Sequence, residues 1–360
     1  MRTLRTFLLL TVLACLASCA DTGYYLQSAG GHLQMMKAAR PIATWLADDS
    51  VAPTLKQRLQ LAERIRAFAV TELQLPDNAS YHRYADLRRR SVVWNVVAAP
   101  AFSLTLKTWC FPVVGCVGYR GYFNEANARA EALALQRDGL EASVYGVPAY
   151  STLGWLNWAG GDPLLNTFIH YPEGELARMV FHELAHQVLY VKDDTRFNES
   201  FATAVEQLGS ARWLAQHGSP AARAEYAAFD GRRRQFRSLL ALTRTRLTQI
   251  YKENEALAHD EPALIAMKKE AMQDFHDDYA RLRSSWGAYA GYDAWVAGAN
   301  NAAFSAQAAY TELTPAFEKL FERQGRDWTR FYDAVRQLAH MPAAERARAL
   351  KQITTEHLSG

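Results

Sequence analysis

Two histidines four residues apart have the clearest chemical potential in this chain. The segment FHELAHQ, residues 181–187, contains His182, Glu183 and His186. On a helix, positions four apart lie one turn above the other, with Cβ atoms about 5–6 Å apart. From that spacing two imidazoles can bind one Zn²⁺, and the glutamate between them can act as general base on a water at the metal. The segment predicts one zinc ion per chain, with Glu183 as the catalytic base.

Apolar residues around the motif indicate that its helix is buried. Leu176, Val180, Leu184 and Val188 recur at helical spacing and form one stripe. Burying two histidines without partners is costly, and a shared metal ion would satisfy both. The alternative is a solvated helix whose histidines have no role.

A second predicted helix, residues 197–208, offers a third ligand. A short polar turn separates it from the first helix, so we expect the two helices to be antiparallel and Glu199 to come close to His186. Glu206 lies two turns further on, where it could orient a ligand imidazole through the other ring nitrogen. The alternative is that both glutamates only solvate an amphipathic helix.

These segments resemble a known group of metallopeptidases. HELAHQ followed by NESFATAVE is similar to the HELAHQ and NEGFA segments of the gluzincin metallo-aminopeptidases, and the resemblance implies that Glu199 is the third zinc ligand. The stretches GYYLQSAGG, CFPVVGCVGYRGYF, VPAYSTLGW and DDTRFNESFATAVE resemble a bacterial family of predicted zinc aminopeptidases. There are two departures. Only twelve residues separate His186 from Glu199, fewer than in the large aminopeptidases, and no GxMEN-like segment is present to hold a substrate amine.

The first residues are typical of an export signal. Arg2 and Arg5 precede an apolar run and small residues, and the whole is too short for a membrane span. Residues 16–19 resemble the lipobox of bacterial lipoproteins, which implies removal of residues 1–18 and a lipid anchor on Cys19. Because Ala20 and not Asp follows, the resemblance implies the outer membrane, facing the periplasm. The alternative is an ordinary signal peptide and a soluble protein.

The net charge bears on one class of partner, nucleic acid. Loss of residues 1–18 removes two arginines and no acid, so the formal charge falls from +3 to +1. A nearly neutral chain does not indicate nucleic acid as a partner. The arginine clusters at 88–90 and 232–234 are expected to be solvated faces.

Two cysteines remain after processing. Cys110 and Cys116 flank a segment in which Pro112 and Gly115 allow the chain to turn back. In an exported protein we expect them to form a disulfide, worth about 2.4 kcal/mol by the chain-entropy relation.

The remaining chain is predicted as short β-strands followed by helices. We expect two helices in 22–75, strands at 91–99, 102–109, 140–147 and 148–155, a helix at 124–139, and helices almost throughout beyond 218. Residues 149–154 could be an edge strand that pairs with a peptide substrate or part of the core sheet. Tyr279, Tyr289, Tyr292 and Tyr310 are candidates for a second donor to an oxyanion, and the sequence does not choose among them.

These observations predict an α+β, mainly helical, zincin-like (gluzincin) fold with a small mixed sheet. Residues 19–360 would form one domain, in which a helical part, 218–360, packs on a core, 19–217. The predicted function is a zinc-dependent peptidase of the cell envelope, most simply an aminopeptidase acting on a peptide substrate. The alternatives are a non-catalytic envelope lipoprotein that uses the scaffold for binding or assembly, and a hydrolase of a non-peptide amide. The oligomeric state stays open.

Overall fold

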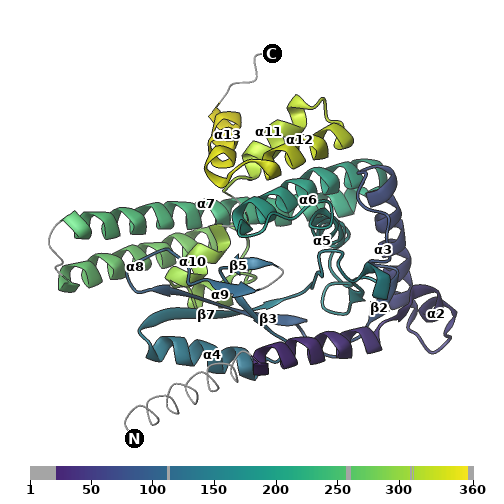
Figure 1. Cartoon of the computed structure of the whole chain (residues 1–360), viewed down its shortest axis with the longest axis horizontal. Helices are drawn as coiled ribbons and strands as arrows, with labels where there is room; N and C mark the ends of the chain where they lie inside the picture. Colours follow the sequence, from purple (N-terminus) through teal and green to yellow (C-terminus); the bar gives the residue numbers. More distant parts are fainter. Residues whose placement is uncertain (1–21, 112–113, 257–260, 309, 311, 356–360) are drawn as a thin grey trace, which may run out of the picture.

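The computed structural model of the chain describes residues 22–111, 114–256, 261–308, 310 and 312–355. Cys19 and the expected signal segment lie outside the described residues. Helices dominate and the strands form three small sheets, which confirms the α+β class (Figure 1). Among the described helices, none combines the length and apolar character needed to cross a bilayer.

The helices fall into two groups along the chain. Before residue 218 they comprise residues 22–38, α2 (Ile42–Ala47), α3 (Pro53–Thr71), α4 (Glu125–Arg137), α5 (Glu173–Ala185) and α6 (Thr195–His217). After it they comprise α7 (Pro220–Ala256), α8 (Glu261–Ser285), α9 (Asp293–Ala297), α10 (Asn301–Ala308), α11 (Thr314–Arg323), α12 (Trp328–His340) and α13 (Ala343–Thr355). The predicted helical character of the second half is confirmed.

One strand, β3 (Val93–Pro100), is buried on both faces of its sheet. It pairs antiparallel with β6 (Arg120–Tyr122) and β7 (Leu140–Val147). Val96 and Ala98 pack with α4, whereas Val97 and Ala99 pack with α10. Because alternate side chains point to opposite faces, burial of both faces accounts for the unbroken apolar run in the sequence.

The other two sheets are smaller. β2 (Arg83–Ala85) pairs antiparallel with β1 (Arg40–Pro41) and parallel with β8 (Leu164–Leu165), so this sheet is mixed. β4 (Trp109–Phe111) and β5 (Gly115–Val117) form an antiparallel hairpin.

Two predicted strands are wrong. In 102–109, only Trp109 is in a strand, because Phe102 and Leu104 pack against the helices around α7 and α8 and not in a sheet. In 148–155, Pro148 lacks the N–H that a ladder needs, and the carboxylate of Asp162 accepts the backbone N–H of Thr152. Residues 149–154 are therefore a loop, and an edge strand for substrate is excluded there.

Helices α5 and α6 lie in the largest apolar core and run antiparallel, as predicted. The indole of Trp213 donates to Glu173 (2.9 Å), and Arg178 donates to Glu206 (2.7 Å), so residues later in α6 meet residues earlier in α5. Helices α11, α12 and α13 contribute to the same core.

Candidate metal centre

Helix α5 carries both histidines on a buried face. It begins after Pro172, and Glu173 and Glu175 in its first turn interact favourably with the helix dipole. Its apolar stripe packs in the main core, so the helix cannot rotate without exposing it. His182 lies in the last turn and His186 is the C-cap residue; both are buried. The helix therefore ends at Ala185, earlier than its apolar pattern predicts.

Capping contacts fix the start of α6, which carries Glu199. The Asp194 carboxylate accepts the backbone N–H of Phe197 (3.0 Å) and is held by Arg346 from α13. The side-chain amide of Asn198 spans the connection, accepting from Val191 N (2.8 Å) and donating to Val191 O (2.7 Å). These two hydrogen bonds to the backbone of one residue place the first turn of α6 against the end of α5.

The structure brings together three potential metal ligands. His182 Nε2 and His186 Nε2 are 3.2 Å apart, and Glu199 Oε2 lies 3.3 Å from the first and 3.6 Å from the second. Two atoms that each lie about 2.0–2.2 Å from a tetrahedral zinc are about 3.3–3.6 Å apart. The spacing of the three atoms, and the set of two imidazoles and one carboxylate, therefore fit a zinc ion.

Glu206 contacts the other nitrogen of His182. Its Oε2 is 2.9 Å from Nδ1, so Nδ1–H can donate to the carboxylate and leave Nε2 free to bind a metal. Arg178 donates to Glu206 (2.7 Å) and to Glu175 (3.0 Å), and Arg233 of α7 donates to Glu175. His182 thus stands at the end of a partly buried chain of alternating charges. The Nδ1 atom of His186 is buried and has no hydrogen-bond partner among the described residues.

Electrostatics in the metal-free site favour a protonated His182. Burial by itself lowers its pKa, but hydrogen bonds with Glu199 and Glu206 outweigh burial and raise the pKa to about 10. Burial raises the pKa of Glu199, but the two histidines hold it well below the usual range. For Glu206, the charge of Arg178 and the His182 contact overcome burial and lower the pKa to about 2. The carboxylates of the site carry negative charge, which the proton on His182 partly neutralises. A bound metal cation can take the place of that proton.

Glu183 lines the same cavity as the three candidate ligands. This cavity has a volume of about 350 Å³. Burial raises the pKa of Glu183, while the neighbouring imidazoles lower it in part. A carboxylate with a raised pKa beside a metal site can accept a proton near neutral pH.

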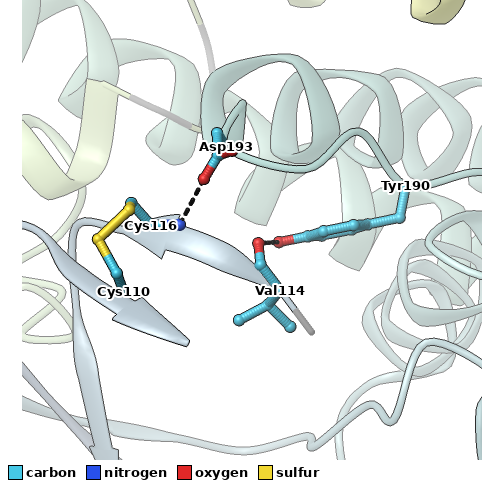
Figure 2. The surroundings of a disulfide bond; sticks show 5 residues. All are labelled: Cys110, Val114, Cys116, Tyr190 and Asp193. Atoms are coloured by element: carbon cyan, nitrogen blue, oxygen red, sulfur yellow. Dashed lines mark hydrogen bonds between the residues drawn. A yellow bond between two sulfur atoms is a disulfide. The ribbon is translucent and has the colours of Figure 1, made fainter. Parts of the chain in front are cut away.

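A disulfide-bonded hairpin forms one wall of the cavity. Cys110 and Cys116 are bonded between β4 and β5, as predicted (Figure 2). Asp193 accepts the backbone N–H of Cys116 (2.6 Å), and the Tyr190 hydroxyl donates to the carbonyl of Val114 (3.2 Å). These contacts tie the hairpin to the segment between α5 and α6. Several apolar hairpin side chains face the cavity, namely Phe111, Val114 and Val117.

Of the four tyrosines considered from the sequence, Tyr310 alone lines the cavity. Its ring centroid lies 6.4 Å from that of His182, and the charge of Glu199 is the largest cause of its raised pKa. Tyr279 and Tyr292 belong to the core around α7 and α8, where Tyr292 stacks on Phe236. Tyr289 packs against Phe229 and Tyr292.

Further tyrosines line the cavity, and little in the sequence around them indicates this role. Tyr119 and Tyr190 line the cavity close to the charge of Glu199. Tyr24 and Tyr25 reach it from the helix at 22–38, although both lie more than 150 positions before the histidines in the sequence. Aromatic residues are common in cores, so only the tertiary structure distinguishes these four.

The cavity wall is otherwise without charge. Among its described lining residues, the only carboxylates are Glu183 and Glu199, and there is no Lys or Arg. The remaining side chains are apolar, aromatic or neutral and polar. An additional acidic residue to hold a free substrate amine is therefore absent from the described lining.

Comparison with known proteins identifies a family. A family model described as "Putative aminopeptidase" matches residues 23–350, which is most of the chain. No curated protein and no solved structure matches it.

Proposed function

Because the chain belongs to the putative aminopeptidase family, we propose that it is a zinc-dependent peptidase with a zincin-like core. One observation carries the proposal: the Nε2 atoms of His182 and His186 and the Oε2 atom of Glu199 converge at 3.2–3.6 Å in a cavity that Glu183 also lines. A binding site for zinc alone has no need of a general base, so the presence of Glu183 favours hydrolysis.

In this proposal His182, His186 and Glu199 hold one zinc ion, and Glu206 holds the ring of His182 in the required tautomer. When bound, zinc supplies a Lewis acid that polarises a carbonyl and lowers the pKa of water. Glu183 accepts a proton from the attacking water and returns it to the leaving nitrogen. The same carboxylate both accepts and releases the proton, and the raised pKa of Glu183 suits it to both steps.

Tyr310 is the proposed second donor to the oxyanion. Its pKa is raised, so its hydroxyl keeps the proton at neutral pH and can donate a hydrogen bond. The Tyr310 ring lies 6.4 Å, centroid to centroid, from that of His182, and both residues line the cavity. Removing a single oxyanion donor typically costs about 10²–10³-fold in kcat.

The substrate proposed is a peptide with apolar side chains near the cleaved bond. The uncharged wall of the cavity disfavours charged side chains, because no partner would replace the water that they lose. The family points to aminopeptidase action. The free amine would then have to find its partners at Glu183, Glu199 or backbone carbonyls.

The proposed location is the bacterial envelope, with Cys19 lipidated and residues 19–360 facing the periplasm as one domain. The support is the lipobox-like sequence at residues 16–19 and the disulfide between Cys110 and Cys116, a bond typical of exported proteins. We propose no nucleic-acid partner.

A peptide-library digestion with parallel zinc analysis tests the function. Wild type should bind about one zinc per chain and cleave peptides, whereas His186→Ala should lose both properties. Free and N-terminally acetylated forms of each peptide distinguish exo- from endopeptidase action. Zinc binding without cleavage of any peptide would instead support a binding scaffold, and equal zinc in both proteins would refute the metal site.

A further inference from the structure

Exposed apolar side chains gather on two segments beside the candidate metal cavity. Of the eight large apolar side chains that are most exposed among the described residues, five lie either on the helix at 22–38 or in the loop that follows residue 153. They are Tyr25, Leu26, Leu33, Trp155 and Trp158. Concentrated exposure of this kind marks an interaction surface, whereas single exposed apolar residues need no explanation.

The N-terminal helix is apolar on its solvent side. Leu26, Ala29, Gly30 and Leu33 recur at helical spacing, and Leu26 and Leu33 are 68% and 59% exposed. Between Asp21 and Lys37 the sequence contains no Asp, Glu, Lys or Arg. The opposite side of the helix is covered by the protein, since Gly31 packs directly against Phe123 and Met35 is in the main core.

The tryptophan loop runs beside the same helix. Tyr150 packs on His32, with ring centroids 5.9 Å apart. Further along the loop, Gly160 lies against the guanidinium of Arg83, which donates to the carbonyl of Met36 (3.2 Å) at the end of the helix. Trp155 and Trp158, between these two contacts in the sequence, are 67% and 85% exposed. Tryptophan with its amphipathic ring is the side chain that favours a membrane–water interface.

The cavity reaches the surface at this helix. Tyr25 lines the cavity and is also 46% exposed, so it stands at the rim, next to Leu26. Leu153, two residues before Trp155, lines the cavity from the loop. A surface that covers the helix and the tryptophans would therefore lie directly at the cavity mouth.

In the sequence, the proposed anchor comes only a few residues before this face. Cys19 precedes Tyr24 by five residues, a stretch that spans at most about 18 Å when fully extended. A lipid on Cys19 would thus hold the N-terminal helix at the bilayer surface. A protein partner would need no such anchor.

We infer that the helix at 22–38 and the loop bearing Trp155 and Trp158 rest on the lipid surface, so that the cavity mouth faces the membrane. The substrate class that follows is polypeptide held at the membrane, such as acylated peptides or protein segments next to the bilayer. The substrate class rests on the proposed peptidase function, whereas the contact with lipid rests on the exposed apolar side chains and on the proposed anchor at Cys19.

The test uses the chain from residue 19 with Cys19→Ser, which retains every described residue and has no lipid. Its binding to vesicles of phosphatidylethanolamine with a minority of phosphatidylglycerol is measured by flotation. The variant Leu26→Glu/Leu33→Glu is compared with Leu242→Glu/Ile265→Glu, a matched pair of exposed positions on α7 and α8 (71% and 51% exposed). These two helices and the N-terminal helix lie on opposite sides of the β3 sheet (Figure 1).

Wild type and the control pair should bind vesicles equally, and Leu26→Glu/Leu33→Glu should bind at least about tenfold more weakly. Brominated lipids should quench tryptophan fluorescence in wild type and less in Trp155→Phe/Trp158→Phe. No vesicle binding by wild type, or equal losses in both pairs, would overturn the inference. The inference would also be overturned if Leu26→Glu/Leu33→Glu lost a dimer or a protein complex without any change in vesicle binding.

A turnover assay separates this inference from the proposed function. Neither substituted pair lines the cavity, so a water-soluble peptide should be cleaved at the wild-type rate by both. A palmitoylated peptide in vesicles should be cleaved at least about tenfold more slowly by Leu26→Glu/Leu33→Glu only. If no peptide is cleaved but Leu26→Glu/Leu33→Glu still weakens vesicle binding, the proposed peptidase function is refuted and the inferred lipid contact is supported.

Discussion

Glu206 offers a sharp test of the proposed metal site, because it contacts a ligand without being one. Its Oε2 is 2.9 Å from His182 Nδ1, and its Oε1 accepts from Arg178 at 2.7 Å. Glu206→Gln keeps the size of the side chain but removes the charge that fixes the His182 tautomer. Loss of such an outer partner typically weakens metal binding about 10–100-fold, or about 1.4–2.8 kcal/mol.

The substitution should also destabilise the metal-free protein. Arg178 loses one of its two carboxylate partners in a partly buried setting, and removing a charged hydrogen-bond partner costs about 1–3 kcal/mol. Glu175→Gln is the matched control, since Glu175 also binds Arg178 but does not touch an imidazole. Both variants should therefore unfold at a lower temperature, and only Glu206→Gln should lose zinc affinity.

Competition with a chelator of known affinity measures zinc binding, and thermal unfolding in excess EDTA measures the stability of the metal-free chain. The reasoning fails if Glu175→Gln and Glu206→Gln weaken zinc binding equally, because the effect would then come from general loosening of α5 and α6. It fails equally if Glu206→Gln binds zinc like wild type.

Three further predictions concern protons, the hairpin and the oxyanion donor. Metal-free His182 has a pKa of about 10 and must lose its proton to bind zinc, so zinc affinity should rise by up to about tenfold per pH unit between pH 6 and pH 9. Calorimetry in buffers of different ionisation enthalpy should show that zinc binding releases protons at pH 7. The absence of proton release would contradict the raised pKa. The double substitution Cys110→Ser/Cys116→Ser should lower the free energy of unfolding by about 2.4 kcal/mol, because it removes the disulfide. It should also raise KM with zinc content unchanged, because the hairpin forms a cavity wall. A variant with the stability and KM of wild type would refute this role. Tyr310→Phe should keep zinc and lower kcat about 10²–10³-fold, whereas Tyr190→Phe, whose hydroxyl binds Val114, should lower it far less; equal losses would exclude Tyr310 as the specific donor.

Much of the candidate site could be predicted because its residues lie within two adjacent helices. The apolar stripes of α5 and α6 determine which faces are buried, and the short connection makes the helices antiparallel. The spacing of the histidines and glutamates then decides which of them meet. The helical end at Ala185 was harder to predict, since the apolar pattern continues to Leu189 while the chain turns.

The errors come from segments whose structure depends on distant residues. The conformation of the loop at 149–154 depends on the carboxylate of Asp162 and on the position of the N-terminal helix. The alternating sequence of the loop reveals neither contact. The segment 102–109 also alternates, but its apolar residues face helices that lie far along the chain. Period-two patterns show burial of alternate residues, and pairing with another strand is a separate condition.

The cavity wall could not be predicted for the same reason. Its aromatic residues include some from the N-terminal helix, some from the hairpin and one from the chain just before α11, and only the fold brings these parts together. The choice of Tyr310 among four tyrosines required the position of its ring against His182.

The most direct test of the proposed chemistry is the turnover of Glu183→Gln at matched zinc occupancy. Gln is nearly the same size, and Glu183 is not among the three candidate ligands, so zinc content and fold should be unchanged. A positioned general base typically contributes about 10²–10⁴-fold, so the rate of peptide cleavage should fall by at least that range. Glu199→Gln, by contrast, should lose zinc affinity and recover part of its activity when zinc is added. Wild-type cleavage by Glu183→Gln with full zinc would contradict the proposed mechanism.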